Sequence, residues 1–362
     1  MKRRLLPRLV LAAAVALVGA ATWFYTGGRH HGPGVVHPTP VPASVILARR
    51  EPVPGSKQIL FGDLHVHTTF SVDAFARALP FLQGEGVHPP ADACDFARFC
   101  SGLDFFALTD HAEGLTPAHW SESKDSIRQC NAVAGDPSSP DLVAFVGWEW
   151  TQVGLTPETH YGHKNVIFRS TAEVSLPSRP ISAGGPVGKA MRDNRDPRVY
   201  AIPLLDPGGR QAYLDFAESQ SELLAVPACP EGLAERELPV ACRETAITPR
   251  DLFAKLRDWG FESMVIPHGT TWGLYTPAGT TWEKQLTPDQ SDPGLQYLFE
   301  IYSGHGNSEE VRSWEAVTPE GTCPEPTSQY EPCCWRAGEI IRQRCKESPD
   351  VCEPRVLDGR SK

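Results

Sequence analysis

Short apolar runs that end in acidic or histidine side chains recur along this chain and predict buried β-strands. They cover residues 59–67, 105–111, 142–150, 163–168 and 264–268. Runs of this length with little alternation are typical of strands covered on both faces, as in parallel sheets. Because the carboxyl ends of parallel strands share one edge of a sheet or barrel, we expect the polar end residues to meet there.

Helical patterns lie between these strands and complete an α/β arrangement. We predict helices over 91–101, 121–134 and 248–260. The last is the clearest, because Thr248 suits an N-cap, Pro249 the first turn and Gly260 the end. Residues 177–244 break the rhythm with glycine pairs and prolines. We expect this stretch to be an insertion, either a lid over a site or a surface excursion without function.

The first strand carries the most informative motif, His65-Val66-His67, followed by Asp73. Side chains at i and i+2 of a strand point the same way, so both imidazoles can bind one cation. Asp73 ends a short turn-rich stretch and can reach back toward the same metal. A lone His-x-His motif is weak evidence, because histidines also serve as hydrogen-bonded strand residues.

Ligand-type residues at the other strand ends strengthen this hypothesis. Asp110 and His111 end the second run, Glu149 ends the third, His163 begins the fourth and His268 ends the fifth. A buried carboxylate or imidazole is costly unless it is paired or bound to a metal. We therefore predict the metal ligands His65, His67, Asp73, His111, Glu149, His163 and His268. Asp110 is expected to act as an orienting partner of a ligand rather than as a ligand.

Composition and charge narrow the function classes. The chain has 362 residues, 41% of them hydrophobic and 22% charged, which is enough for a globular domain with a sizeable core. Its formal net charge is −10. No basic stripe is available to release counterions from a nucleic-acid backbone, so we expect no nucleic-acid partner.

The N-terminus predicts export. Basic residues 2–4 precede an apolar stretch, and residues 1–28 fit either a cleaved signal peptide or an uncleaved anchor through residues 5–25. Residues 29–57 are rich in Gly, Pro and His and are typical of a linker. We expect a periplasmic or extracellular protein, with or without attachment to the membrane.

Ten cysteines agree with that compartment. No Cys-x-x-Cys pair is present, so zinc-ribbon spacing is absent. Disulfides are favoured, with Cys94 to Cys100 and Cys229 to Cys242 as local candidates. The pairing of the five cysteines in the extension 311–362 stays open, and free buried thiols are the alternative.

The order of motifs from His65 to His268 resembles that of the PHP (polymerase and histidinol phosphatase) superfamily of metal-dependent phosphoesterases. The strings Phe61-Gly-Asp-Leu-His-Val-His67, 149–151, 163–168 and 300–309 are similar to its branch named domain of unknown function 3604. The resemblance covers about residues 59–310. It implies a distorted TIM-like (βα)₇ barrel over 58–310, with two or three metal ions in a cleft at the strand ends.

One motif of the superfamily is missing. Its site is normally closed by an Asp-x-His pair on a late strand, and no Asp-x-His follows His268. We therefore expect the chain to be the N-terminal portion of a longer protein, or its site to be degenerate.

The predicted ligands indicate the chemistry. Imidazoles combined with carboxylates suit Zn, Mn or Fe better than Mg or Ca. Two or three such ions can share a hydroxide, lower its pKa and hold the oxygens of a phosphate. Hydrolysis of a small phosphorylated substrate is the matching reaction. Glu149 is the best bridging ligand because a carboxylate has two oxygens, and Glu149 and Asp110 are the predicted catalytic residues.

Several alternatives stay open. His160 competes with His163 for one ligand position. His305 and Asn307, in a Gly-rich turn, suit either substrate phosphate binding or ordinary turn and capping roles. An amidohydrolase-type metal enzyme also begins with His-x-His, although it commonly needs a bridging lysine. A catalytically degenerate binding or structural protein is the third hypothesis.

Overall fold

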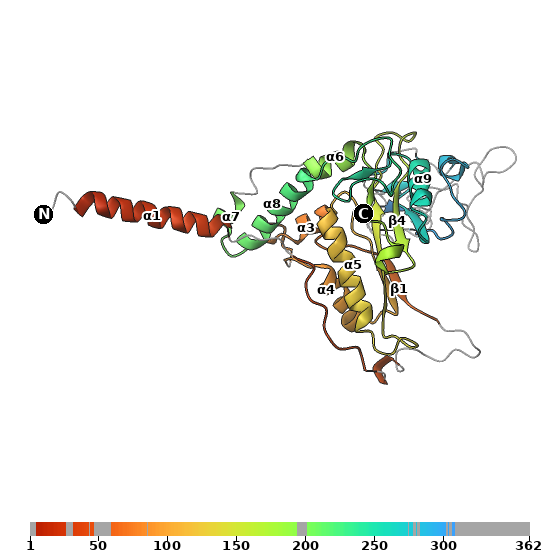
Figure 1. The fold of residues 1–362 in the computed structure, drawn as a ribbon, viewed down its shortest axis with the longest axis horizontal. Coiled ribbons are helices and arrows are strands. Elements are labelled where there is room, and N and C mark those ends of the chain that lie inside the picture. Colours follow the sequence, from red (N-terminus) through yellow and green to blue (C-terminus); the bar gives the residue numbers. More distant parts are fainter. Residues whose placement is uncertain are drawn as a thin grey trace, which may run out of the picture. The chain divides into compact units, whose positions relative to one another are not determined.

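The protein is described here by a computed structural model covering residues 5–26, 32–42, 44–46, 59–84, 86–193, 201–273, 275–277, 280, 283–301, 303 and 306–307. Its elements are mapped in Figure 1. The predicted extension 311–362, with its five cysteines, lies outside the described residues, as does His305.

A mixed sheet forms the centre of the described part, with five strands in the order β1-β2-β3-β4-β7. The strands are β1 (Gly62–Val66), β2 (Phe105–Leu108), β3 (Val143–Trp150), β4 (His163–Phe168) and β7 (Ser263–His268). They match the five predicted runs. β1, β2 and β3 are parallel, whereas β4 is antiparallel to both β3 and β7. The α/β class is therefore confirmed, but the described residues do not form the complete parallel barrel of seven strands.

The sheet curls, as half of a barrel would. The amide nitrogen of Asn165 in β4 donates a hydrogen bond to the main-chain oxygen of Leu64 in β1, over 3.3 Å, although β2 and β3 separate the two strands in the sheet. The segment 295–300 follows the other edge of β7, through hydrogen bonds from the Val265 nitrogen to the Leu295 oxygen and from the Glu300 nitrogen to the Pro267 oxygen.

The two faces of the curled sheet carry different side chains. The outer face carries the large core cluster, which includes Trp148 and Trp150 of β3. The inner face carries a small apolar layer of Ala107, Ile167 and Ile266. Because side chains alternate along a strand, the residues that continue this inner face toward the strand ends are polar.

Helices cover the outer face, and their ends follow the predicted capping signals. α5 (Pro117–Ala132) contacts β3, and α9 (Pro249–Trp259) contributes Leu252 and Leu256 to the same core cluster. Thr248 and Asp251 form a capping box at the start of α9, and Gly260 ends it with a left-handed backbone. α4 (Pro90–Asp95) continues into a π-helix over Phe96–Ser101.

A disulfide joins α4 to α5, and it corrects one prediction. Cys94 pairs with Cys130, over a Cα–Cα distance of 6.1 Å, whereas Cys100 is a free, exposed thiol. Cys94 and Cys130 belong to the buried core cluster, where the two helices pack. Proximity in the sequence pointed to Cys100, but the helix turns that residue away from the core.

The described residues of the predicted insertion 177–244 hold three helices and a short strand. These are the short strand β5 (Ile181–Ser182) and the helices α6 (Gly185–Asp193), α7 (Ile202–Leu205) and α8 (Arg210–Ala225), and the insertion ends at β6 (Glu244–Thr245), which pairs with β5.

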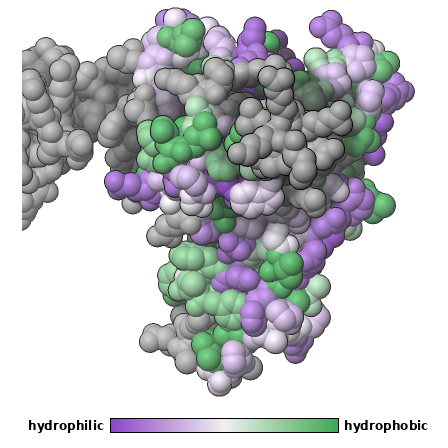
Figure 2. Space-filling model, turned by 90° about the vertical axis from the view of Figure 1, so that its left-hand side faces the viewer, coloured by the Kyte–Doolittle hydropathy of each residue, from purple (hydrophilic) through white to green (hydrophobic). Residues whose placement is uncertain are grey.

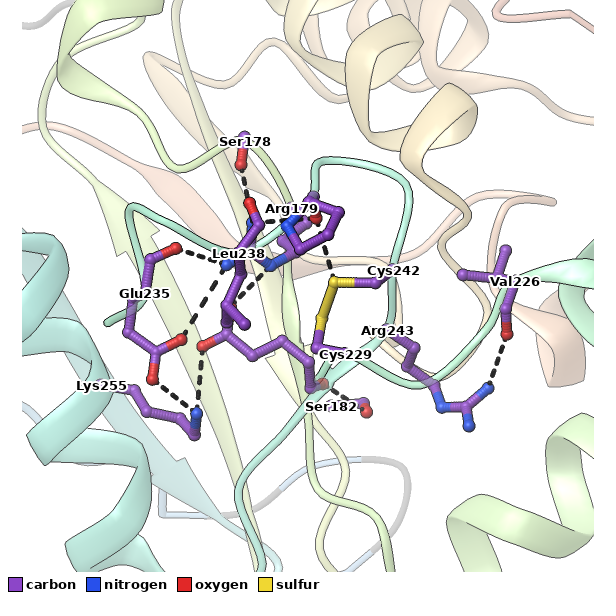
Figure 3. The surroundings of a disulfide bond; sticks show 12 residues. Ser178, Arg179, Ser182, Val226, Cys229, Glu235, Leu238, Cys242, Arg243 and Lys255 are labelled. Atoms are coloured by element: carbon purple, nitrogen blue, oxygen red, sulfur yellow. Dashed lines mark hydrogen bonds and ion pairs between the residues drawn. A yellow bond between two sulfur atoms is a disulfide. The ribbon is translucent and has the colours of Figure 1, made fainter. Parts of the chain in front are cut away.

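The predicted bridge from Cys229 to Cys242 is confirmed and stands beside a buried ionic network (Figure 3). In this network the Arg179 Nε lies 2.9 Å from a Glu244 carboxylate oxygen, and the Lys255 Nζ lies 2.6 Å from Glu235. The network ties the insertion to α9, which carries Lys255.

Shorter elements complete the described chain. They are α3 (Val72–Ala78), the 3₁₀ turns Pro80–Leu82, Glu173–Ser175 and Glu283–Leu286, and the two-residue strands β8 (Trp272–Gly273) and β9 (Gly306–Asn307), which pair with each other. Among the residues coloured in Figure 2, hydrophobic and hydrophilic ones are mixed on the face shown.

The N-terminal segment forms the helix α1 (Leu5–Thr26), in the place where a signal peptide or anchor was predicted. Among the described residues, no helix combines the length and the hydropathy that crossing a membrane requires. The two disulfides of the described part are typical of proteins in oxidising, extracytoplasmic compartments.

Candidate metal centre

The seven predicted ligands gather at one edge of the curled sheet, although they come from distant parts of the sequence. β1, β2, β3 and β7 contribute residues from or just beyond their carboxyl ends. β4 contributes its first residue, His163, because this strand runs in the opposite direction and pairs His163 with His268. The antiparallel strand thus explains why a ligand candidate stands at the start of its apolar run. Asp73 comes from the first turn of α3.

An irregularity in β1 shapes the His65-Val66-His67 motif. The register between β1 and β2 shifts between Asp63 and Val66. Such bulges re-aim side chains near functional sites. The Asp63 carboxylate accepts a hydrogen bond from the His65 main-chain nitrogen within this irregular stretch. The Nε2 atoms of His65 and His67 then lie 3.0 Å apart, aimed at the same point.

Glu149 is the centre of the cluster and is completely buried. Its Oε2 atom lies 3.2 Å from the His65 Nε2 and 3.0 Å from the His67 Nε2. The ligand atoms of these three side chains lie close enough together to hold a single ion. Such a set of side chains is called an ion-sized group below.

The other oxygen of Glu149 faces a second set of imidazoles. Its Oε1 atom lies 2.6 Å from the His163 Nδ1, 3.3 Å from the His111 Nδ1 and 3.6 Å from the His268 Nε2. Glu149, His163 and His268 form a second ion-sized group, buried throughout. One carboxylate therefore presents each oxygen to a separate group, which is the arrangement of a bridging ligand.

Two further groups extend the cluster on either side. His67, Asp73 and His111 form one, in which the His111 Nε2 lies 3.1 Å from an Asp73 oxygen. His65, His268 and Glu300 form the other, in which the His65 Nδ1 lies 3.0 Å from a Glu300 oxygen. Buried clusters of histidine and carboxylate side chains such as these can hold metal ions.

Glu300 was missed as a ligand candidate. Its signal was nevertheless present in the sequence, because Leu298-Phe299-Glu300 is a short apolar run that ends in a carboxylate, like the other strand ends. The run is too short to predict a strand from its pattern, and it forms no regular strand in the structure. Its place is fixed by the hydrogen bond from the Glu300 nitrogen to the Pro267 oxygen, beside β7.

Asp110 lies outside the ion-sized groups and acts on a ligand through Ser71. Its carboxylate accepts hydrogen bonds from the Thr68 nitrogen at 2.6 Å, the Thr68 hydroxyl at 2.9 Å and the Ser71 hydroxyl at 2.8 Å. These donors offset burial, which raises the Asp110 pKa. The Ser71 hydroxyl has one hydrogen, which it donates to Asp110. It must therefore accept from the His67 Nδ1, 2.9 Å away, which leaves the His67 Nε2 free to bind a cation.

Thr151 orients a second ligand candidate. Its hydroxyl lies 2.5 Å from the His111 Nδ1 and 3.3 Å from the Glu149 Oε1. The His111 main-chain nitrogen donates to the Ser71 hydroxyl at 2.9 Å. With its backbone and Nδ1 both held, His111 presents its Nε2 to Asp73.

The charges of the cluster depend on burial and on the central carboxylate. Burial alone opposes protonation of His65, but hydrogen bonds with Glu149 and Glu300 raise its pKa to about 10. Burial lowers the pKa of His268 well below its usual value. Burial would raise the pKa of Glu149, but the imidazoles around it, His111 first, hold that pKa well below its usual range. The carboxylate thus stays ionised as a ligand must.

His268 provides a direct test of whether the residues fit a metal. Its side chain is completely buried, and neither ring nitrogen has a hydrogen-bond partner within the described part of the chain. The closest carboxylate oxygens are those of Glu149 at 3.6 Å and Glu300 at 3.9 Å. An unsatisfied buried polar group costs about 1–3 kcal/mol. A cation held in either of the two groups that contain His268 would offset that cost for the nitrogen it binds, so the residues fit a bound metal.

The remaining site predictions have separate outcomes. His160 is buried away from the ion-sized groups, where its Nδ1 accepts a hydrogen bond from the Gly154 nitrogen and its Nε2 lies 3.2 Å from the Gly269 oxygen, so His163 is the residue that reaches the cluster. His305 lies outside the described residues. Asn307 is the last residue of β9. The substrate-binding role of these two residues stays a prediction.

Comparison with known sequences gives one family match. A sequence model described as "Protein of unknown function (DUF3604)" matches residues 54–136. This stretch includes His65, His67, Asp73 and His111. No curated protein and no solved structure matches the chain. Over residues 54–136, which hold the first half of the candidate centre, the chain is similar to this family of unknown function.

Proposed function

We propose that this protein is an exported metal-dependent hydrolase that cleaves phosphoesters with two or three divalent ions. The observation that carries the proposal is the position of Glu149, whose two oxygens face separate sets of imidazoles. Bridging carboxylates of this kind hold neighbouring ions a few ångströms apart. The order of ligand motifs, which resembles that of PHP phosphoesterases, adds the reaction class.

Each residue of the proposed metal centre has a role that follows from its position. Glu149 is the bridging ligand, and the imidazoles of His65, His67, His163 and His268 complete the groups on its two oxygens. The bound ions would supply an activated hydroxide and hold the phosphate oxygens. Asp110 and Ser71 hold the proton on the Nδ1 of His67, so that its other nitrogen is available as a ligand. Asp110 is therefore a positioning residue in this proposal.

The ligand types favour zinc, manganese or iron. Imidazole nitrogens predominate, and magnesium or calcium would prefer cages made of oxygen atoms alone. The proposed substrate is a small phosphorylated molecule, and the strongly acidic chain makes a nucleic acid an unfavourable partner.

The amidohydrolase alternative gains no support from Lys164, the lysine that the sequence places beside a predicted ligand. Lys164 is the β4 residue next to His163, but it is completely buried. Its Nζ donates to the Tyr161 oxygen at 3.0 Å and lies 5.5 Å from the ring centre of Trp150, a residue of the outer core. It therefore points away from the cluster and is in no position to bridge two ions there.

Metal content and activity measured together test the proposal. We expect the purified chain to bind two or more equivalents of transition metal and to hydrolyse a chromogenic phosphomonoester or phosphodiester. His65→Ala/His111→Ala should lose both properties. Arg169→Ala/Glu262→Ala is the matched control, because these two residues form an exposed ion pair that belongs neither to the ion-sized groups nor to a cavity beside them.

Three outcomes would count against the proposal in different ways. A well-folded chain without metal would leave a binding or structural protein as the better hypothesis. Bound metal with amide but not phosphoester hydrolysis would favour the amidohydrolase alternative. Phosphoester hydrolysis that survives loss of His65 and His111 would contradict the assignment of the site.

A further inference from the structure

A cavity of about 740 Å³ lies beside β1, and the two histidines of its His-x-His motif reach into it. His65 and His67 belong to its lining. Further lining residues come from α4 and the π-helix that follows, which lie in the same lower part of Figure 1 as β1. The volume is in the range of sites that bind small molecules.

Much of the remaining lining is apolar and aromatic. This part of the wall includes Phe96, Phe99, Leu103 and Phe106. Phe106 is completely buried and belongs to the core, whereas Phe99 keeps 39% of its surface exposed. π-Helical turns are uncommon and frequently occur at functional sites. Here the wider turn spans Phe96–Ser101 and supplies much of this wall.

Three carboxylates, those of Asp63, Asp92 and Asp95, line the cavity, and no lysine or arginine does so among the described residues. Besides His65 and His67, the lining holds His88, whose Nδ1 lies 3.4 Å from an Asp92 oxygen. Hydrogen bonds hold two of these carboxylates, because Asp63 accepts from the His65 nitrogen and both oxygens of Asp95 accept from the His37 nitrogen. Fixed carboxylates repel an anionic group that enters a partly desolvated space.

We propose that this cavity binds the organic group of the substrate, and that this group is aromatic and carries no negative charge of its own. The proposal rests on the proposed function and deepens it. A phosphate held at His65 and His67 would place its ester substituent against Phe96 and Phe99. Nucleotide and sugar bisphosphate esters are thereby excluded as good substrates, because their further phosphates would face the aspartates.

Phosphonates provide a test that needs no turnover. We would measure the affinity of the zinc-loaded full chain for methylphosphonate, phenylphosphonate and 4-carboxyphenylphosphonate by calorimetry. All three offer the same head group to the metals, so differences between them report on the space beside it. Burial of a phenyl ring should tighten binding about tenfold over methylphosphonate, and the added carboxylate should cancel most of that gain.

Matched variants test which residues produce the phenyl preference and the carboxylate penalty. Phe99→Ala should remove most of the phenyl preference and leave methylphosphonate binding unchanged. Phe81→Ala is the control, because Phe81 is 70% exposed and does not line the cavity. Asp92→Asn should restore part of the affinity for 4-carboxyphenylphosphonate.

The outcomes separate this inference from the proposed function. Equal affinity for the methyl and phenyl compounds would overturn the cavity assignment while leaving the metal centre as the phosphate site. A phenyl preference that Phe99→Ala does not change would also overturn it. No binding of any phosphonate to the zinc-loaded chain would overturn both.

Discussion

His163 of β4 lies directly opposite His268 of β7 in the sheet, at the edge where the other strands present their carboxyl ends. A parallel β4 would place its first residue at the far edge. Reversal of this strand therefore brings the Nδ1 of His163 to 2.6 Å from Glu149 and completes one side of the central carboxylate.

Replacement of the central carboxylate should dismantle the metal centre. Glu149→Gln keeps the shape of the side chain but removes the negative charge that five imidazoles surround. We expect loss of at least one equivalent of bound metal, measured by elemental mass spectrometry. Glu262→Gln, at a surface ion pair with Arg169, should bind as much metal as the unmodified chain. Equal metal content in both variants would show that Glu149 is not a bridging ligand.

Loss of the Ser71 hydroxyl should weaken metal binding without removing a ligand. Ser71→Ala breaks the links from Asp110 to the His67 Nδ1 and to the His111 nitrogen. Removal of such supporting hydrogen bonds typically lowers metal affinity 10- to 100-fold. Titration against a chelator would measure this change, with the surface substitution Ser138→Ala as its control. Unchanged affinity would mean that the tautomer of His67 is fixed in another way.

The two helices beside the sheet should depend on their disulfide. Cys94 and Cys130 are separated by 36 residues, and a bridge that closes such a loop contributes about 3–4 kcal/mol by restricting the unfolded chain. Cys94→Ala/Cys130→Ala should therefore lower the unfolding temperature clearly. Cys100→Ala, at an exposed free thiol, should change it little. A non-reducing peptide map that joins Cys94 to Cys100 instead would contradict the structure.

The buried ionic network beside Cys229 and Cys242 should make stability depend on pH. Burial, followed by the hydrogen bond with Glu235, raises the pKa of Glu244 from 4.5 to about 8. The folded protein therefore holds a proton that the unfolded chain releases. This contribution to stability is complete below pH 4.5 and is lost as the pH rises through about 8.

Denaturant unfolding between pH 5 and 8.5 would measure this effect. Glu244→Gln carries the neutral form permanently, and its free energy of unfolding should decline less over this range than that of the unmodified chain. Parallel curves for the two proteins would contradict a protonated Glu244 in the fold.

Much of the local structure was predictable because it depends on neighbouring residues. The five apolar runs became the five strands of the central sheet. The capping signals of Thr248 and Gly260 marked the ends of α9, since they act within one helical turn. The pair Cys229 and Cys242 was also predictable, because a short loop keeps the two residues close.

Interactions between distant residues were harder to predict. Cys130, rather than Cys100, pairs with Cys94 because two helices pack together, which no local pattern encodes. Glu300 reaches His65 because an irregular segment follows β7. The choice of His163 over His160 became visible in the sheet register, which sets the direction of each side chain.

By itself, the sequence determined the strand-forming runs, the helix ends and the set of imidazole and carboxylate side chains that can bind metals. Those properties follow from local hydrophobic patterning and from the chemistry of individual residues. Only the tertiary structure decided the direction of β4, the curl of the sheet, the division of imidazoles between the two oxygens of Glu149 and the hydrogen bonds from Asp110 through Ser71 to His67. Each of these depends on contacts between segments far apart in the chain, whose geometry is set by packing around the common core.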